Sequence, residues 1–133
     1  ETGAKEPLQQ IKTLIDLTGE VLILPEGYKV AIVPGSDTGA FELLMWSLLG
    51  KNETTMLVWE SFGNDWAEDA VDQLNLANCK VERAEYGDLP KLNEVSNNSD
   101  ICFTWNGTTS GVRVPNSNWI ENKRNHWKGR SCY

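Results

Sequence analysis

The 133-residue sequence lacks the features that would place it in a specialised class of protein. No apolar run approaches the roughly 18 residues needed to cross a bilayer, since the longest, at 21–24 and 41–49, are short or interrupted by Glu42. Basic residues are few, 12 against 19 acidic ones, so a nucleic-acid-binding surface is not expected. With 40% hydrophobic and 23% charged residues, the composition indicates one globular domain that neither enters a membrane nor binds nucleic acid.

Cysteine and histidine are scarce as well. Cys79, Cys102 and Cys132 are odd in number, widely spaced and outside any CxxC pair, so neither a disulfide framework nor a zinc site is indicated. A reducing, cytoplasmic compartment is the simplest expectation. His126 is the only histidine, so the sequence offers no clear nucleophile paired with a histidine base.

Charge is unevenly distributed along the chain. Residues 121–133 hold four basic residues against one acidic residue and carry +3, whereas residues 1–120 carry −10. We therefore expect a main part, residues 1–120, and a divergent basic tail, residues 121–133. The sequence begins Glu1-Thr2-Gly3 without Met or an apolar leader, so we expect its start to result from processing, from the choice of the expressed segment or from excision from something longer.

Hydrophobic periodicity and turn residues predict alternating helices and strands. Helices are expected over about 7–22, 40–49 and 65–75, and a short one over 89–95. The second is apolar nearly all round, which predicts that it is buried. Strands are expected over 28–33, 54–59, 79–84 and 100–105. This alternation predicts an α/β fold in three αβα layers, with a mostly parallel sheet covered on both faces.

Three loops are expected beyond the carboxyl ends of these strands, where open parallel sheets bind ligands. The first, residues 35–39, offers small residues and a helix N-terminus suited to a phosphate. It has neither the GxxxxGK[ST] pattern of nucleotide-triphosphate loops nor the GxGxxG pattern of dinucleotide-binding loops. The second, residues 60–66, brings Trp66 to the start of a helix. The third, residues 106–111, presents the hydroxyls of Thr108, Thr109 and Ser110.

Each loop also has a purely structural interpretation. Ser36 or Asp37 is suited to capping the following helix, and Trp66 to filling a core. Residues 106–111 are typical of a turn whose polar groups satisfy one another. The carboxylates of residues 60–72 are expected on a solvated helix face and not as an acid–base pair.

Three blocks of sequence together resemble the phosphoserine aminotransferase family, in the form typical of alphaproteobacteria. They are VAIVPGSDTGA at residues 30–40, WESFG at 59–63 with Trp66, and FTWNGTTSGVRVPN at 103–116. The likeness runs from about Lys5 to Ile120, with the blocks in the family's order and spacing. The resemblance implies part of the large domain of a homodimeric enzyme of the aspartate aminotransferase superfamily, which depends on pyridoxal 5'-phosphate. In serine biosynthesis the family interconverts 3-phosphohydroxypyruvate plus glutamate with phosphoserine plus 2-oxoglutarate.

The resemblance also implies roles for four residues. Asp37 and Thr38 correspond to the loop that receives the cofactor phosphate, Trp66 to the ring that stacks on the pyridine, and Thr108 to the hydroxyl near the cofactor's phenolic oxygen. The family's Schiff-base lysine has no counterpart in the matched residues, and Lys123 and Lys128 match no family motif. No catalytic residue is therefore assigned, and we expect the isolated chain to bind the cofactor weakly or not at all and to be inactive.

Two further interpretations remain. An incomplete parallel sheet exposes a strand edge and apolar faces, which favours self-association or a rearranged fold. A protein of another functional class, a non-catalytic α/β module that uses its acidic surface for protein contacts, has the same pattern of strands and helices. Binding of pyridoxal phosphate that depends on Trp66 distinguishes the aminotransferase interpretation from this one.

Overall fold

A computed structural model of the chain describes residues 4–120 and 131–132. It divides into two compact units, Glu1–Ser36 and Asp37–Tyr133, which are considered separately. The basic tail expected over residues 121–133 lies almost entirely outside the described residues.

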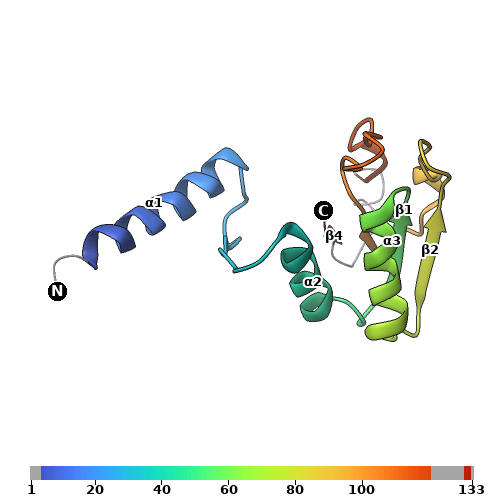
Figure 1. Cartoon of the computed structure of the whole chain (residues 1–133), viewed down its shortest axis with the longest axis horizontal. Helices are drawn as coiled ribbons and strands as arrows, with labels where there is room; N and C mark the ends of the chain where they lie inside the picture. The colour runs from blue at the N-terminus through green and yellow to red at the C-terminus, as the bar shows by residue number, and fades with distance from the viewer. Residues whose placement is uncertain (1–3, 121–130, 133) are drawn as a thin grey trace. The chain divides into compact units, whose positions relative to one another are not determined.

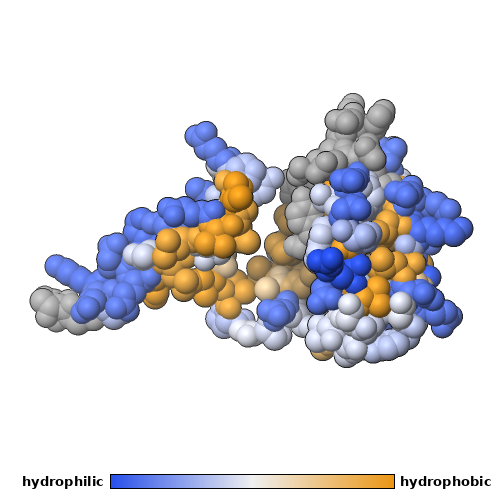
Figure 2. Space-filling model, turned by 90° about the horizontal axis from the view of Figure 1, so that it is seen from above, coloured by the Kyte–Doolittle hydropathy of each residue, from blue (hydrophilic) through white to orange (hydrophobic). Residues whose placement is uncertain are grey.

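The first unit consists of one helix, α1 (Lys5–Val21), and the irregular chain that follows it (Figure 1). The helix confirms the amphipathic pattern, and its apolar side chains form a continuous band on this unit (Figure 2). The strand predicted over 28–33 is wrong, because these residues form no strand. A strand needs a neighbour to bind its N–H and C=O groups, and no described strand pairs with this segment.

The second unit contains a sheet in which every described pairing is parallel. Its strands are β1 (Glu53–Val58), β2 (Cys79–Arg83), β3 (Ser99–Cys102) and β4 (Ser131–Cys132), in the order β2-β1-β3-β4. These positions confirm the strands predicted near 54–59 and 79–84, while the one predicted over 100–105 begins one residue earlier and ends at Cys102.

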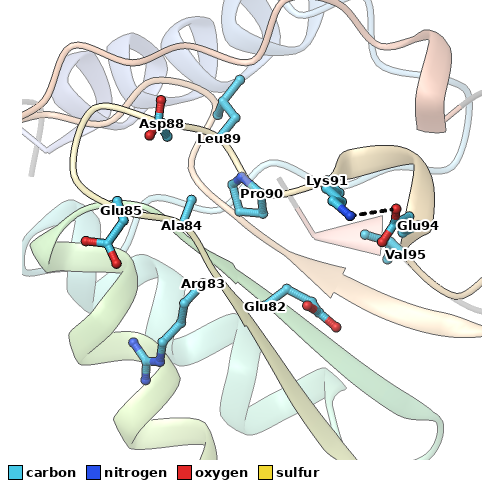
Figure 3. A pocket seen from close by; sticks show the side chains of 10 residues that line it. All are labelled: Glu82, Arg83, Ala84, Glu85, Asp88, Leu89, Pro90, Lys91, Glu94 and Val95. Atoms are coloured by element: carbon cyan, nitrogen blue, oxygen red, sulfur yellow. Dashed lines mark ion pairs between the residues drawn. The ribbon is translucent and has the colours of Figure 1, made fainter.

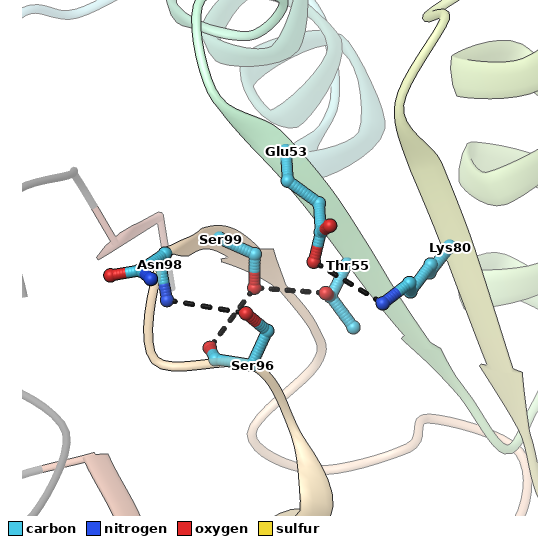
Figure 4. Close-up of polar contacts among 6 residues, drawn as sticks. All are labelled: Glu53, Thr55, Lys80, Ser96, Asn98 and Ser99. Atoms are coloured by element: carbon cyan, nitrogen blue, oxygen red, sulfur yellow. Dashed lines mark hydrogen bonds and ion pairs between the residues drawn. The ribbon is translucent and has the colours of Figure 1, made fainter.

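Polar contacts join the amino ends of the strands (Figure 4). The Thr55 hydroxyl donates to Ser99 Oγ over 2.9 Å, and the Ser99 hydroxyl donates to the Ser96 carbonyl over 3.2 Å. Lys80 on β2 lies 3.5 Å from the Glu53 carboxylate on β1. These contacts tie β1 to both neighbours at the edge from which the strands start.

The helices of the second unit follow the predicted order with altered boundaries. They are α2 (Asp37–Leu48), α3 (Ser61–Glu68), which continues as the π-helix η1 (Asp69–Gln73), and the 3-10 helix η2 (Leu92–Glu94). The expectation that 40–49 is buried is wrong: only Met45 is fully buried, while Leu43 and Trp46 are 51% and 62% exposed. Only one side of α2 packs on described residues, so its remaining apolar side chains face solvent.

The core lies on both faces of the sheet, because successive side chains of β1 alternate between them. Met56 and Val58 pack with residues of α2 and α3, whereas Leu57 and Trp59 pack with residues 95–120 on the other face. The α/β class and the coverage of both faces are therefore as predicted.

No helix among the described residues has both the length and the hydropathy that a bilayer crossing demands.

Candidate functional site

A cavity of about 460 Å³ in the second unit brings together residues from all three predicted loops. Its volume falls in the range of about 300–1,000 Å³ that small-molecule sites occupy. The four residues to which the sequence assigned a binding role all line it, namely Asp37, Thr38, Trp66 and Thr108. Its other lining residues are Phe41, Phe62, Phe103, Thr104, Trp105 and Asn106.

The first side of the cavity is the N-terminus of α2. Asp37 is the first residue of that helix and is exposed, and Thr38 follows it half-buried. The first N–H groups of a helix have no partner within the helix and carry its positive dipole end, which favours an anion nearby. No lysine or arginine is among the described residues that line the cavity. Attraction for an anion at this wall therefore comes from backbone N–H groups and not from a cationic side chain.

The second side is formed by aromatic rings on α2 and α3. Trp66 is 8% exposed and belongs to the core, so its structural interpretation is confirmed while its ring also lines the cavity. Phe41 stacks on it with 4.1 Å between ring centroids and 14° between planes. The buried Nε1–H of Trp66 has no hydrogen-bond acceptor among the described residues. One face of the indole is thus covered by Phe41, and its N–H can still donate a hydrogen bond.

The third side is the turn that carries Thr108. The amide of Gly107 donates to the Val112 carbonyl over 2.9 Å, and the amide of Gly111 donates to the Gly107 carbonyl over 2.8 Å. Ser110 Oγ accepts from the Val112 amide over 3.2 Å, as the turn interpretation expects. The Thr108 side chain is exposed and takes no part in this network, so its hydroxyl is available to a ligand.

Glu60 departs from what the sequence predicted. The expectation of a solvated carboxylate is wrong at this position, because Glu60 is only 5% exposed. As the N-cap of α3, its Oε1 accepts from the Gly63 amide over 2.7 Å and its Oε2 from the Phe62 amide over 3.1 Å. The sequence prediction began this helix at about residue 65, whereas it begins at Ser61, so the position of Glu60 directly before the helix was missed.

Two carboxylate side chains, Glu42 on α2 and Asp69 on η1, interact with each other. Burial raises the pKa of Glu42 above its ordinary value of 4.5, and a hydrogen bond to Asp69 and the charge of Asp69 raise it further. The two side chains come from the helices that carry Phe41 and Trp66. The pair therefore lies at the contact between two walls of the cavity.

A second cavity, of about 620 Å³, lies beyond the end of β2 (Figure 3). The acidic side chains of Glu82, Glu85, Asp88 and Glu94 outnumber the basic ones among the residues that line it. Lys91 is already paired with Glu94 at 3.2 Å (Figure 3). This excess of negative charge opposes a phosphorylated ligand, so we assign the candidate site to the aromatic cavity.

Comparison with known proteins identifies two close relatives. The chain is 49% identical over 121 residues to the phosphoserine aminotransferase of Methanosarcina mazei, which covers 91% of this chain and 33% of the relative. It is 50% identical over 116 residues to the phosphoserine aminotransferase of Methanosarcina barkeri, which covers 87% of this chain and 31% of the relative. No protein-family model and no solved structure matches the chain. The resemblance predicted from the sequence is therefore confirmed: over most of its length this chain is similar to phosphoserine aminotransferases, and it spans about a third of the length of each relative.

Proposed function

We propose that this chain forms the cofactor-receiving part of a phosphoserine aminotransferase. The observation that carries the proposal is the single cavity lined by Asp37, Thr38, Trp66 and Thr108, which come from three distant segments. In the proposed enzyme 3-phosphohydroxypyruvate and glutamate are converted to phosphoserine and 2-oxoglutarate, so phosphoserine and glutamate are small-molecule substrates of the reversible reaction. The names of the two relatives support the same reaction.

The residues at the cavity fit pyridoxal 5'-phosphate. Trp66 offers a flat apolar surface, and Thr38 and Thr108 offer hydroxyl groups. The N-terminal amides of α2 suit a phosphate, and an exposed Asp37 can turn its carboxylate away from it. When bound, the cofactor supplies an electron sink for the charge left when the substrate Cα loses a proton. In our proposal, this chain's residues hold the cofactor ring flat and anchor its phosphate.

We propose that residues 1–133 alone bind the cofactor weakly and do not catalyse transamination. A lysine amine is needed to hold the cofactor covalently and to move the substrate proton, and no lysine lines the described part of the cavity. In this proposal residues 1–120 are a partial large domain and residues 121–133 a divergent tail. The proposed setting is the cytoplasm, where the thiols of Cys79 and Cys102 stay reduced.

Self-association is part of the same proposal. Leu43 and Trp46 on α2 are large apolar side chains exposed to solvent, and they support contacts with a second copy. The charged residues of β2, including Lys80 and Glu82, oppose pairing of that strand with another edge. The proposed assembly, as in the family, is a homodimer.

The experiment is a titration of the purified chain with 4'-deoxypyridoxine 5'-phosphate. This probe keeps the ring and phosphate but lacks the aldehyde, so it cannot react with surface lysines. We expect quenching of tryptophan emission that saturates in the wild type and is lost in Trp66→Ala. Trp46→Phe is the matched control, because Trp46 is 62% exposed on α2 and does not line the cavity.

A folded wild-type chain that shows no saturable binding would contradict the proposal. In that case the non-catalytic interaction module becomes the better interpretation. Circular dichroism of each variant shows whether lost binding reflects lost structure.

A further inference from the structure

We infer that Glu60 and Gly107 form a positioning joint that fixes Trp66 relative to Thr108 across the cavity. The inference rests on the proposed function, because the cavity is the one proposed to receive the cofactor. Neither residue lines the cavity itself. Both act through neighbours that do, and we therefore regard them as positioning residues and not as catalytic ones.

The Glu60 side chain holds the first turn of α3. Its two carboxylate oxygens accept the amides of Phe62 and Gly63, at 3.1 and 2.7 Å. Phe62 lines the cavity, and Trp66 lies one helical turn further along α3. Because these amides have no acceptor within the helix, the carboxylate fixes where α3 begins and so where both rings lie.

The same side chain packs against the turn that carries Thr108. A Cβ placed on Gly107 would lie 2.9 Å from Glu60 Cγ, 3.1 Å from Trp59 Nε1 and 2.6 Å from Ser110 Oγ. Side-chain atoms do not tolerate such distances, so only glycine allows the turn to approach the strand end this closely. Trp59 Nε1 also donates to the Val112 carbonyl over 3.3 Å, and that carbonyl accepts from the Gly107 amide as well.

Glu60 therefore lies between two glycines. A Cβ on Gly63 would meet Glu60 Oε1 at 3.2 Å, and a Cβ on Gly107 would meet its Cγ at 2.9 Å. One buried side chain thus contacts both the helix that presents Trp66 and the turn that presents Thr108. Displacement of either element moves the other through Glu60, because close-packed buried atoms have no free space to absorb it.

The test combines Gly107→Ala with Glu60→Ser. Gly107→Ala forces the turn away from Glu60, and we expect it to weaken binding of 4'-deoxypyridoxine 5'-phosphate about tenfold, within the usual range for contacting residues. Serine is a good N-cap and has no Cγ, so the double variant relieves the contact with Glu60, while the contacts with Ser110 and Trp59 remain, and it should recover part of the affinity. Gly19→Ala is the matched control, because its Cβ meets only Val30 at 4.0 Å.

Hydrogen exchange gives a second measurement that needs no ligand. Glu60→Gln keeps the size of the side chain and weakens its hold on the Phe62 and Gly63 amides. Faster exchange at Gly63 is expected for any N-cap, whereas an increase at Gly107 that exceeds the increase at protected amides distant from Glu60 is expected only if the joint transmits the change. We expect about tenfold faster exchange at Gly107, as for loss of one hydrogen bond or contact.

The joint is refuted if Glu60→Gln leaves exchange at Gly107 unchanged. It is also refuted if the folded Gly107→Ala chain binds as the wild type does, or if the double variant recovers none of the affinity that Gly107→Ala loses. If Gly107→Ala does not fold, the exchange rate of the Gly107 amide in Glu60→Gln tests the inference instead. A wild-type chain that shows the coupled exchange but binds no probe refutes the proposed function and leaves the joint intact.

Discussion

Phe41 and Trp66 stack face to face, with 4.1 Å between ring centroids and 14° between planes, and both line the candidate cavity. Phe41 comes from the first turns of α2 and Trp66 from α3. The contact holds the indole in one orientation and covers one of its faces, while the indole still lines the cavity. It also joins the helix whose N-terminus suits a phosphate to the helix that presents the aromatic surface.

Replacement of Phe41 by leucine should weaken ligand binding more than it weakens the fold. Leucine keeps apolar volume but cannot stack, and aromatic pairs contribute about 0.5–1.5 kcal/mol beyond the area that they bury. We expect affinity for 4'-deoxypyridoxine 5'-phosphate to fall about two- to tenfold, measured by titration. Leu43→Ala, at an exposed position of α2 outside the cavity, is the control. Equal affinities for Phe41→Leu and the wild type would show that the stack does not orient Trp66.

Trp66→Ala should destabilise the second unit strongly. The side chain is 8% exposed and packs with Met56 and Val58, and truncation of a buried tryptophan typically costs about 3–5 kcal/mol. Because Trp66 also lines an open cavity, we expect the lower end of this range in urea unfolding. In the monomeric chain at low protein concentration, Trp46→Ala should change the free energy of unfolding by less than about 0.5 kcal/mol, because the side chain is exposed there. Similar losses for the two variants would mean that Trp66 is not part of the core.

Sequence reasoning predicted residues that line the cavity better than it predicted the residues that support them. Asp37, Thr38, Trp66 and Thr108 follow turn signals or lie near helix starts, and local sequence marks such positions well. The strand predicted at 28–33 was wrong because a β-branched run becomes a strand only when another strand pairs with it. That partner is a property of the tertiary structure and has no local signal.

Glu60 and Gly107 illustrate the same limit at the site. A glutamate before a helix is usually solvated, and a glycine in a turn usually serves a backbone angle. Here Glu60 is buried, and Gly107 is needed for a close approach between segments 47 residues apart in sequence. Only the packing of the turn on the end of β1 reveals either role.

Glu42→Gln should remove a pH dependence of stability. The folded state raises the pKa of Glu42 above 4.5, chiefly through burial and then through its hydrogen bond to Asp69 and the charge of Asp69. The folded chain therefore binds more protons than the unfolded chain, and the free energy of unfolding falls as the pH rises from about 4.5 through the raised pKa. We expect the glutamine variant to lose this decline and to melt at a higher temperature near neutral pH. Thermal melts across this range test it, and parallel profiles for the two proteins would contradict it.

Thr108→Val should reduce ligand binding without reducing stability. The Thr108 side chain is exposed and outside the hydrogen-bond network of its turn, so the folded chain loses no internal contact. A hydrogen bond to a ligand is typically worth about 0.5–1.5 kcal/mol, which predicts about a two- to twelvefold weaker affinity for 4'-deoxypyridoxine 5'-phosphate. The control is Thr109→Val, because Thr109 is the exposed neighbour and does not line the cavity, while its carbonyl still accepts from Tyr86 over 2.7 Å. If the two valine variants bind alike, the Thr108 hydroxyl does not contact the ligand, and the third wall of the cavity has only a structural role.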